Sequence, residues 1–435
     1  MMEASEAGVV VEERPKTGRS RIGFGALRNR EFTLFWSGQA ISQTGTWMQQ
    51  FAQGWVVATL ASSALALASV NLAASIPILF LTPFGGVAAD RMDRRRILLF
   101  TQTVLAVLAI VLGVVIQAGD LRLWEVWLVA LLLGVATAYD LPAYQAFYPQ
   151  LVEREDLPQA IALNQATFHG SRIIGPAIAS WLVARWGTAA AFYANSASFL
   201  AVIGSLLLIR PAPAAGTTGH TRLSMGEGVR YVREHPHIVA LLGLTAMTTM
   251  LVFPNAATLM PFYAKHVLQV GPGGLGIIMA ASGTGAFLGA MFLLALPRRF
   301  RIAWITTALV VIALALCGLA QSRYLPLSVT AVAILSFGIS STLGVASTMV
   351  QESVPDALRG RVMSLYSLAF TGVAPFAALA VAWLADVIGM RRELQLAAVL
   401  FGICGVLLIP MIRKMESRMV YGNRLTDHPP AKRKG

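Results

Sequence analysis

Apolar residues in this chain of 435 residues occur in long blocks separated by short polar segments. A block of about 20 residues matches the roughly 30 Å of hydrocarbon that a spanning helix crosses at 1.5 Å per residue. Because the bilayer core offers the backbone no water, each block is expected to be an α-helix. The pattern therefore predicts an all-α membrane protein with twelve transmembrane helices. The twelve blocks are residues 32–60, 64–87, 96–117, 122–145, 158–184, 187–209, 237–257, 271–296, 302–320, 325–350, 360–386 and 393–412.

The composition agrees with a membrane protein. Hydrophobic residues make up 56% of the chain and charged residues 13%, whereas soluble domains carry roughly 25% charged residues. The formal net charge of +13 raises the question of a nucleic-acid partner. The basic residues, however, lie between the apolar blocks and at both ends, without a separate basic domain. We therefore expect contact with membrane lipids and no nucleic-acid partner.

Residues 85–98 set the expected orientation in the membrane. Their apolar run stops at Asp90 and gives way to arginines at positions 91 and 94–96. If twelve spans alternate, 27 of the 34 Lys and Arg residues fall on the side of this cluster and 6 on the other side. Cytoplasmic loops carry an excess of Lys and Arg. We expect a multi-pass membrane protein with both termini in the cytoplasm.

The longest interruption, residues 211–236, divides the chain into six plus six predicted spans. Its second part, residues 223–234, has the pattern of a short amphipathic helix at the membrane surface. Four identities at an offset of 202 residues, among them Phe168 with Phe370, favour two related six-helix bundles. The expected units are a cytoplasmic N-terminal tail (1–30), an N-terminal six-helix bundle (31–210), a cytoplasmic linker (211–236), a C-terminal six-helix bundle (237–412) and a basic tail (413–435).

The fifth predicted span carries Gln165, His169 and Arg172 at spacings of four and three, so that they share one helix face. An ionised side chain at mid-membrane costs at least about 2.5–3.5 kcal/mol, so Arg172 is expected to face a water-filled cavity or a partner. The alternative is that Arg172 bonds backbone carbonyls or Asp140 and holds the bundle together. His169 is either a proton carrier or a hydrogen-bonded packing residue.

The first predicted span carries a second polar stripe with helical spacing. A lipid-facing row of amides would lack hydrogen-bond partners, so the stripe is expected to face protein or a water-filled path. Lining of a substrate cavity and hydrogen bonding between helices are the two interpretations. The stripe consists of Gln39, Gln43, Thr46, Gln50 and Gln53.

Three sequence segments resemble the major facilitator superfamily of transporters. Residues 85–96 read GGVAADRMDRRR and are similar to that superfamily's signature G-x-x-x-D-R-x-x-R-R between spans two and three. Residues 28–55 and 354–370 resemble the bacterial branch that contains the enterobactin exporter and macrolide-efflux relatives. The similarity covers nearly all of residues 25–415. It implies the twelve-helix fold of two bundles that rock around a central site, in the bacterial cytoplasmic (inner) membrane.

The resemblance also implies a cytoplasmic gate. In the superfamily, the Asp of the signature, here Asp90, stabilises the outward-facing state by lying near the cytoplasmic start of span eleven. The gate loop would comprise Gly86, Asp90, Arg91, Arg94 and Arg95. The alternative is that the arginines only fix the topology and bind lipid headgroups. The sequence departs from the signature at residue 93, where an aspartate replaces the usual small glycine, and this is expected to weaken close approach.

Three residues are the expected partners of the gate loop. Asp356 and Arg361 lie at the start of predicted span eleven, whose N-terminal dipole favours a nearby carboxylate. Asp140, near the cytoplasmic end of span four, is the expected acidic partner of the loop arginines. In span five, Gly175 and Pro176 stand at positions of a bend signature that the superfamily associates with antiporters, although Ser171 and other residues replace its remaining glycines.

Motifs for enzyme chemistry are not found in the sequence. It contains no phosphate-binding loop, no set of residues with metal-ligand spacing and no nucleophile motif, so we expect no enzyme, no cofactor and no metal. An ion gradient, of protons in the first instance, is then the expected energy source, with Asp140 and His169 as candidate carriers. The sequence leaves the oligomeric state open and is compatible with a monomer.

The predicted function is secondary transport of a small molecule. Arg172 and the glutamines favour export of a polar or anionic solute, such as a siderophore, by alternating access. A broad-specificity drug exporter of the macrolide type is the alternative in the same class. A non-transporting membrane sensor or scaffold is the alternative in another class, and an intact Asp90 loop argues against it.

Overall fold

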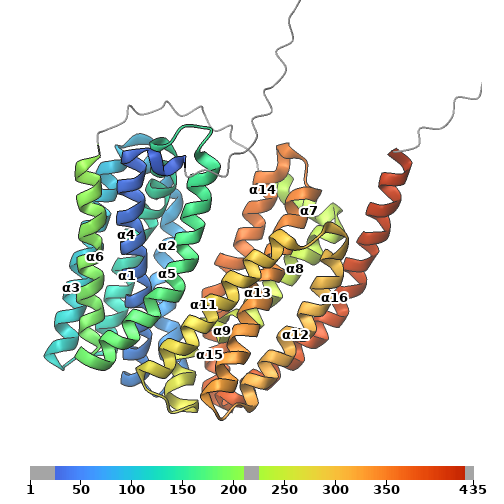
Figure 1. The fold of residues 1–435 in the computed structure, drawn as a ribbon. Helices are drawn as coiled ribbons and strands as arrows, with labels where there is room; N and C mark the ends of the chain where they lie inside the picture. Colours follow the sequence, from blue (N-terminus) through green and yellow to red (C-terminus); the bar gives the residue numbers. More distant parts are fainter. Residues whose placement is uncertain (1–24, 210–224, 427–435) are drawn as a thin grey trace, which may run out of the picture.

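The computed structural model of the protein describes residues 25–209 and 225–426, with side chains for most of them up to residue 411. Most of the predicted N-terminal tail, the first part of the predicted linker and the end of the predicted C-terminal tail lie outside these ranges. The described residues are almost entirely helical (Figure 1). The structure is therefore all-α, as the apolar pattern predicts.

The first half of the chain forms six long helices that pack as one bundle (Figure 1). Side-chain caps fix several of their starts, because the first N–H groups of a helix have no partner within it. Asn29 accepts hydrogen bonds at the start of α1, Ser63 at the start of α2 and Asp93 at the start of α3. The six helices are α1 (Arg30–Leu60), α2 (Ala64–Arg91), α3 (Arg94–Ala118), α4 (Leu123–Phe147), α5 (Leu157–Trp186) and α6 (Thr188–Leu208).

The second half forms a second bundle beside the first (Figure 1). It begins with the short helix α7 (Met225–Glu234), which lies where the sequence predicts an amphipathic helix. The other elements are α8 (Pro236–Leu251), α9 (Phe253–Ala256), α10 (Met260–Phe262), η3 (Tyr263–Val267), α11 (Pro272–Ala295), η4 (Arg298–Phe300), α12 (Arg301–Gln321), α13 (Leu325–Ser353), α14 (Asp356–Ser367), η5 (Leu368–Gly372), α15 (Ala374–Ile388) and α16 (Met390–Thr426).

The seventh span is not the continuous helix that the sequence predicts at residues 237–257. It is broken into α8, α9, α10 and the π-turn η3. Pro254 and Pro261 explain the breaks, since proline has no N–H to donate and its ring clashes with the preceding turn. At the other end of the chain, α16 continues to Thr426 instead of ending near residue 412.

Nine helical stretches among the described residues are long and apolar enough to cross a membrane. The predicted count of twelve is not reached by this criterion. The breaks in the seventh segment shorten its longest helix, α8, to Pro236–Leu251. The helices α1 and α5 have the length but not the hydropathy. These two helices carry the polar residues that the sequence analysis singles out.

Small residues bring helices of each bundle into backbone contact. A Cβ atom on Gly134 of α4 would lie 2.2 Å from the carbonyl oxygen of Ala74 on α2. A Cβ atom on Gly285 of α11 would lie 2.1 Å from the carbonyl oxygen of Ala333 on α13. Such close approach is the usual means by which membrane helices associate. Each bundle therefore has a tightly packed pair of helices.

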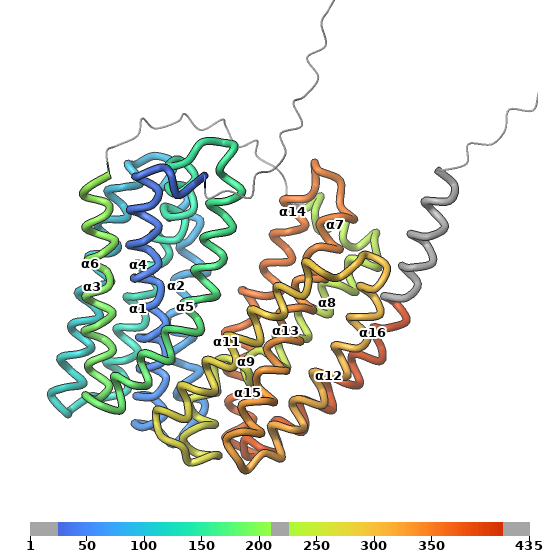
Figure 2. Tube along the Cα trace, viewed as in Figure 1, coloured from blue at the N-terminus to red at the C-terminus, as the bar shows by residue number. Residues whose placement is uncertain are grey.

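The two bundles meet at one end and diverge at the other (Figure 2). We call the end with residues 91–94 and 354–356 the basic end and the end with residues 61–63 and 389 the opposite end. The bundles contact each other through α5 with α11 and through α2 with α15. A Cβ atom on Gly276 would lie 2.3 Å from the Ser180 side chain, and one on Gly283 would lie 3.0 Å from the Arg172 carbonyl oxygen. Glycines therefore line the interface on the α11 side.

Candidate functional site

Arg172 of α5 reaches from one bundle to the other. Its Nη2 donates a hydrogen bond to Ser282 Oγ of α11 at 3.3 Å, and Ser282 in turn bonds Ser336 Oγ at 2.9 Å. The guanidinium lies over the Trp47 ring, 5.7 Å from its centroid. No carboxylate within the described ranges pairs with Arg172. Arginine has five N–H donors, so this side chain keeps donors for a ligand.

Aromatic rings surround this arginine. Phe168 packs edge-on against Trp47 with ring centroids 5.8 Å apart. His169 contacts Phe168 and, across the bundle interface, Phe287 at centroid distances of 5.5 and 6.1 Å. His169 Nδ1 and Trp47 Nε1 are buried and have no hydrogen-bond partner in the part of the chain that the structure describes. Buried polar atoms are normally paired, so these two favour a site that a ligand or water completes.

The predicted cavity glutamines show no hydrogen bonds to the described protein. Gln50 and Gln165 are exposed, whereas Gln39 and Gln43 are half-buried. Their amides are thus available to water or a solute in this conformation. A different glutamine makes the bond between helices, because Asn195 Nδ2 donates to Gln49 Oε1 at 2.6 Å. Gln49 lies outside the predicted stripe and was not among the predicted site residues.

Gly175 and Pro176 of α5 are buried where this helix crosses its neighbours. A Cβ atom on Gly175 would lie 2.5 Å from Trp47 Cβ and 3.0 Å from the Thr44 carbonyl oxygen of α1. Thr44 and Ser171 also share a hydrogen bond of 3.0 Å. These contacts hold α1 and α5 together, so that Trp47 and Arg172 lie side by side.

Two arginines of the predicted gate loop bond helix ends within their own bundle. Arg94 donates to the carbonyl oxygens of Ala89 at 3.0 Å and Ala146 at 3.3 Å. Arg95 donates to those of Leu206 at 2.6 Å and Leu207 at 3.2 Å. These carbonyls lie near the C-terminal ends of α2, α4 and α6, where a cation is favourable. Both arginines therefore tie the loop to the bundle.

Asp93 accepts a hydrogen bond of 2.9 Å from the Arg95 backbone nitrogen and so caps α3. Its φ of −63° is ordinary for any residue. The expected weakening of the close approach of loop and helix therefore has no cause in the backbone conformation at this aspartate and stays a prediction.

The remaining part of the gate loop is open in this conformation. Asp90 and Arg91 are exposed and make no hydrogen bond or ion pair within the described residues. A Cβ atom on Gly86 would have open space before it. The structure thus leaves Asp90 apart from the start of α14, although the resemblance implies their contact in an outward-facing state.

The expected gate partners have other contacts here. Asp356 pairs with Arg359 at 2.5 Å, and Arg361 pairs with Glu227 of α7. The predicted pairing of Asp140 with loop arginines is wrong for this conformation. Asp140 instead accepts hydrogen bonds from Thr101 at 2.5 Å and Gln102 at 3.0 Å, because α3 packs against α4 at this level.

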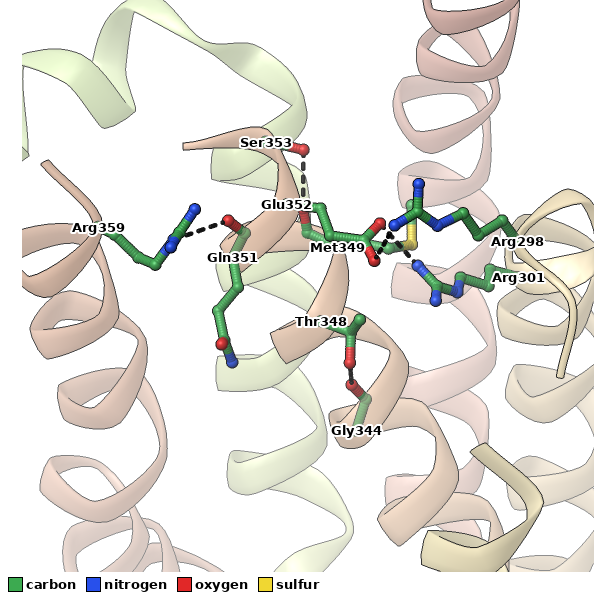
Figure 3. A network of polar contacts seen from close by, with 9 residues as sticks. All are labelled: Arg298, Arg301, Gly344, Thr348, Met349, Gln351, Glu352, Ser353 and Arg359. Atoms are coloured by element: carbon green, nitrogen blue, oxygen red, sulfur yellow. Dashed lines mark hydrogen bonds and ion pairs between the residues drawn. The ribbon is translucent and has the colours of Figure 1, made fainter. Parts of the chain in front are cut away.

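A polar network at the basic end of the second bundle surrounds Glu352 of α13 (Figure 3). This carboxylate accepts from Arg298 at 3.1 Å and from Arg301 at 2.8 Å. Arg359 Nε donates to the Gln351 carbonyl oxygen at 3.2 Å. The network joins α12, α13 and α14, so these helices are fixed to one another.

At the opposite end, residues that the sequence analysis did not single out join the two bundles. The Asp386 carboxylate of α15 accepts from Ser63 Oγ at 2.6 Å and from the backbone nitrogens of Ala64 at 2.7 Å and Leu65 at 3.0 Å. It therefore caps α2 of the other bundle. His266 Nε2 also lies 2.9 Å from the Ala58 carbonyl oxygen. Ser63 precedes an apolar run and so signals a helix start in the sequence, but its partner Asp386 is 323 residues away.

Known proteins resemble the chain over most of its length. A family described as "Transmembrane secretion effector" matches residues 22–432. Macrolide efflux protein A of Streptococcus pyogenes is 27% identical over 89% of this chain and 96% of its own. The enterobactin exporter EntS of Escherichia coli O1:K1 / APEC is 29% identical over 65% and 68% of the two chains.

Solved structures share the fold. A bacterial homologue of the human lysosomal transporter Spinster, in an inward-facing and unoccupied conformation, has a TM-score of 0.68 at 15% identity. The alignment covers 88% of this chain and 97% of that chain. The predicted resemblance to the major facilitator superfamily is thus confirmed. The chain belongs to the transmembrane secretion effector family of major facilitator transporters and is a multi-pass membrane protein.

Proposed function

We propose that the protein is a proton-coupled exporter of a small polar or anionic solute in the bacterial cytoplasmic membrane. The observation that carries this proposal is Arg172, a cation at the interface of the two bundles without a carboxylate partner in the described structure. A charged group inside a membrane protein marks a solute or ion pathway by default. A carboxylate or catecholate group of a solute fits its free N–H donors.

Alternating access is the proposed mechanism. The excess of Lys and Arg assigns the basic end to the cytoplasm, with twelve spans and both termini on that side. The hydrogen bonds between the bundles lie at the level of Arg172 and at the opposite end. In this assignment the conformation is open to the cytoplasm and closed to the periplasm. The units 31–210 and 237–412 would be the bodies that rock.

Two carboxylates would select between the two states. Asp386 at the N-terminus of α2 supports the inward-facing state. Asp90, now free, would support the outward-facing state by approaching the N-terminus of α14. A carboxylate at a helix N-terminus contributes about 0.3–1 kcal/mol when exposed and up to about 2 kcal/mol when partly buried. Such energies are comparable to the few kcal/mol that separate two conformations of one protein.

Solute binding would act directly on the bundle interface. Arg172 bonds Ser282 of the other bundle in this conformation. An anionic solute that takes over the guanidinium would compete with that bond and so favour separation of α5 from α11. The similarity to the enterobactin exporter supports a siderophore-like solute.

A macrolide-type drug is the second candidate solute. The rings of Trp47, Phe168 and Phe287 near Arg172 provide apolar area for a large ligand. The similarity to macrolide efflux protein A supports this reading.

Transport by the purified protein in proteoliposomes tests the proposal. Anionic siderophores, macrolides and cationic drugs are offered with and without an imposed pH gradient. Gradient-driven movement of an anionic siderophore that is lost in Arg172→Ala, but kept in the exposed control Arg185→Ala, is the expected result. Movement of drugs alone, unaffected by Arg172→Ala, would select the second candidate. No movement of any solute would overturn both and favour a membrane sensor or scaffold.

A further inference from the structure

A buried carboxyl group in the second bundle has no role in the site described above. Glu393 lies in the first turn of α16 and is 1% exposed. Its neighbour Asn255 belongs to α9, one of the pieces of the broken seventh segment, and is fully buried. Asn255 Nδ2 donates to Glu393 Oε1 at 3.1 Å and to the Leu251 carbonyl oxygen at 3.3 Å.

The pair leaves two buried oxygens without partners in the described structure. They are Glu393 Oε2 and Asn255 Oδ1, one on each side chain. Both are acceptors if the carboxyl group is ionised. If Glu393 Oε2 carries a proton, it becomes a hydrogen-bond donor. Asn255 Oδ1 can accept that bond, because the amide nitrogen of the same side chain already donates to Glu393 Oε1. A neutral carboxyl group and a primary amide are complementary in this way, with one N–H···O and one O–H···O bond.

Charged neighbours do not supply an alternative partner. On the same helix, Arg391 donates to the Ser322 carbonyl oxygen at 3.1 Å. From η3, Lys265 lies over the Trp55 ring and His266 bonds the Ala58 carbonyl. The other titratable groups near this end of the second bundle make no hydrogen bond or ion pair with Glu393 within the described residues. They are Arg392, Tyr263, Cys317, Arg323 and Asp386.

The start of α16, which carries Glu393, lies beside a hollow at the opposite end of the protein. A surface hollow of about 330 Å³ lies beside the start of α16. It is lined by His266, Val267, Ile388, Gly389, Met390, Arg391 and Arg392. Met390 is one helical turn from Glu393. The hollow therefore reaches the first turn of α16, the turn that carries the buried Glu393 side chain.

The other side of the pair connects to the helices near the gate. Asn255 stands between the breaks that Pro254 and Pro261 impose. The adjacent Phe253 packs edge-on against Phe370 of η5, at the junction of α14 and α15, with centroids 5.2 Å apart. A change in the Glu393–Asn255 bond would therefore move a segment that contacts predicted span eleven.

We propose that the Glu393–Asn255 pair binds and releases the coupled proton of this transporter. This inference rests on the proton-coupled function proposed above. On binding, an O–H bond forms at Oε2, and that O–H donates to Asn255 Oδ1. On release, the proton leaves to water and the carboxylate keeps a single amide donor. An ion buried with so few partners is unfavourable, so release favours movement of the seventh segment towards water.

Infrared spectroscopy of the purified protein tests proton binding without any solute. The carbonyl band of a protonated carboxyl group, recognised by its shift in D₂O, is followed as the pH is raised. We expect a component that disappears on titration and is absent in Glu393→Gln. The matched control is Glu125→Gln, because Glu125 also lies in the first turn of a helix but accepts a hydrogen bond of 2.8 Å from the Arg122 backbone nitrogen. An unchanged component in Glu393→Gln would overturn the proposal.

Transport measurements separate proton coupling from a merely structural role. In Glu393→Gln we expect gradient-driven transport to fall at least about tenfold, while solute exchange at equal pH on both sides persists and loses its pH dependence. Loss of both activities would point to misfolding. Glu393→Asp, which keeps the acid, then decides the question, and it must retain a gradient-driven activity with an altered pH profile or the proposal falls.

The failures of the two proposals are distinguishable. Wild-type transport that ignores the pH gradient would contradict proton coupling as a whole. Wild-type coupling that survives Glu393→Gln would contradict only the assignment of the carrier. Transport that is driven by a sodium gradient and lost in Glu393→Gln would show that a metal cation takes the place of the proton. That result would also overturn the assignment of Glu393 as the proton carrier.

Discussion

The Asp386 carboxylate lies 2.7 Å from the backbone nitrogen of Ala64, so an acid of one bundle caps the first turn of a helix in the other. Asp90 stands at the other end of that same helix α2, and Asp386 ends the predicted span that begins with α14. The two spans run in opposite directions. Each therefore offers an acid at its C-terminal end and a helix N-terminus at its beginning, and the proposed gates use these pairs in turn.

Removal of the Asp386 side chain is expected to shift the protein towards the outward-facing state. Asp386→Ala deletes three hydrogen bonds at the α2 N-terminus. Loss of such a cap costs about 0.5–2 kcal/mol, which changes the ratio of the two states by roughly 2- to 30-fold. Spin labels at Met92→Cys and Ala357→Cys, in a background without Cys317 and Cys404, report the distance between the bundles at the basic end.

The matched control is Asp120→Ala, because Asp120 is exposed at the opposite end and makes no hydrogen bond or ion pair among the described residues. The short-distance population is expected to grow in Asp386→Ala and to stay constant in Asp120→Ala. Equal distributions in both variants would show that the cap does not hold the inward-facing state.

Asp90→Asn is expected to change the same distance in the opposite direction. Loss of the charge weakens the contact with the start of α14 only in the outward-facing state, by about 0.3–1 kcal/mol. Transport should slow, with little loss of protein from the membrane. Asp93→Asn is the control, since Asn also caps a helix. A shift of the same sign for Asp90→Asn and Asp386→Ala would contradict the two-gate mechanism.

Arg172→Ala is expected to weaken binding of anionic solutes. A hydrogen bond to a charged group is worth about 1.5–3 kcal/mol, so affinity should fall roughly 10- to 100-fold. Trp47, whose ring lies under the guanidinium, provides a fluorescence signal for titration. Ser282→Ala removes the bond between Arg172 and the other bundle, together with the contact to Ser336 within that bundle, and should leave solute affinity equal to that of the wild type or higher. Solute affinity in Ser282→Ala below that of the wild type would contradict the proposed competition.

Gly134→Val is expected to destabilise the first bundle. The new Cβ would meet the Ala74 carbonyl oxygen at 2.2 Å, which forces α2 and α4 apart. Overpacking of this kind costs about 1–3 kcal/mol. Gly318→Val, at a glycine with open space before it, is the control. Thermal unfolding in detergent should show a lower midpoint for the first variant alone.

The sequence predicts the helices well because their length and hydropathy are local properties. The arginines at 91 and 94–96 lie at the end of α2 and the start of α3, where the two helices join as expected, and most helix ends fall within a few residues of the predicted blocks. The broken seventh segment was predictable in principle, since Pro254 and Pro261 stand in or beside its apolar block. A pattern of apolar residues alone does not show where prolines remove the backbone N–H groups that a continuous helix needs.

The contacts between distant residues were not predictable from the pattern. Glu393 stood at the edge of an apolar block and was assigned no role, but its partner Asn255 is 138 residues away. Gln49 lies beside the predicted stripe on α1, and its partner Asn195 belongs to α6. The expected contact of Asp90 with α14 stays a prediction for an outward-facing state, because a sequence does not indicate which contacts belong to which conformation. Arg172 was predictable because a charged residue within an apolar block can be recognised from the sequence alone.

Gly276 and Gly283 have a consequence for the speed of transport. At these positions α11 meets α5 through backbone and small groups. Interlocked large side chains would have to withdraw from their sockets before two helices part. At these two positions α11 has no side chain to withdraw, so we expect the helices to part there with little steric resistance. We therefore expect a lower barrier for opening than a fully interdigitated interface would impose, with turnover set by how long the solute and the gates hold each state.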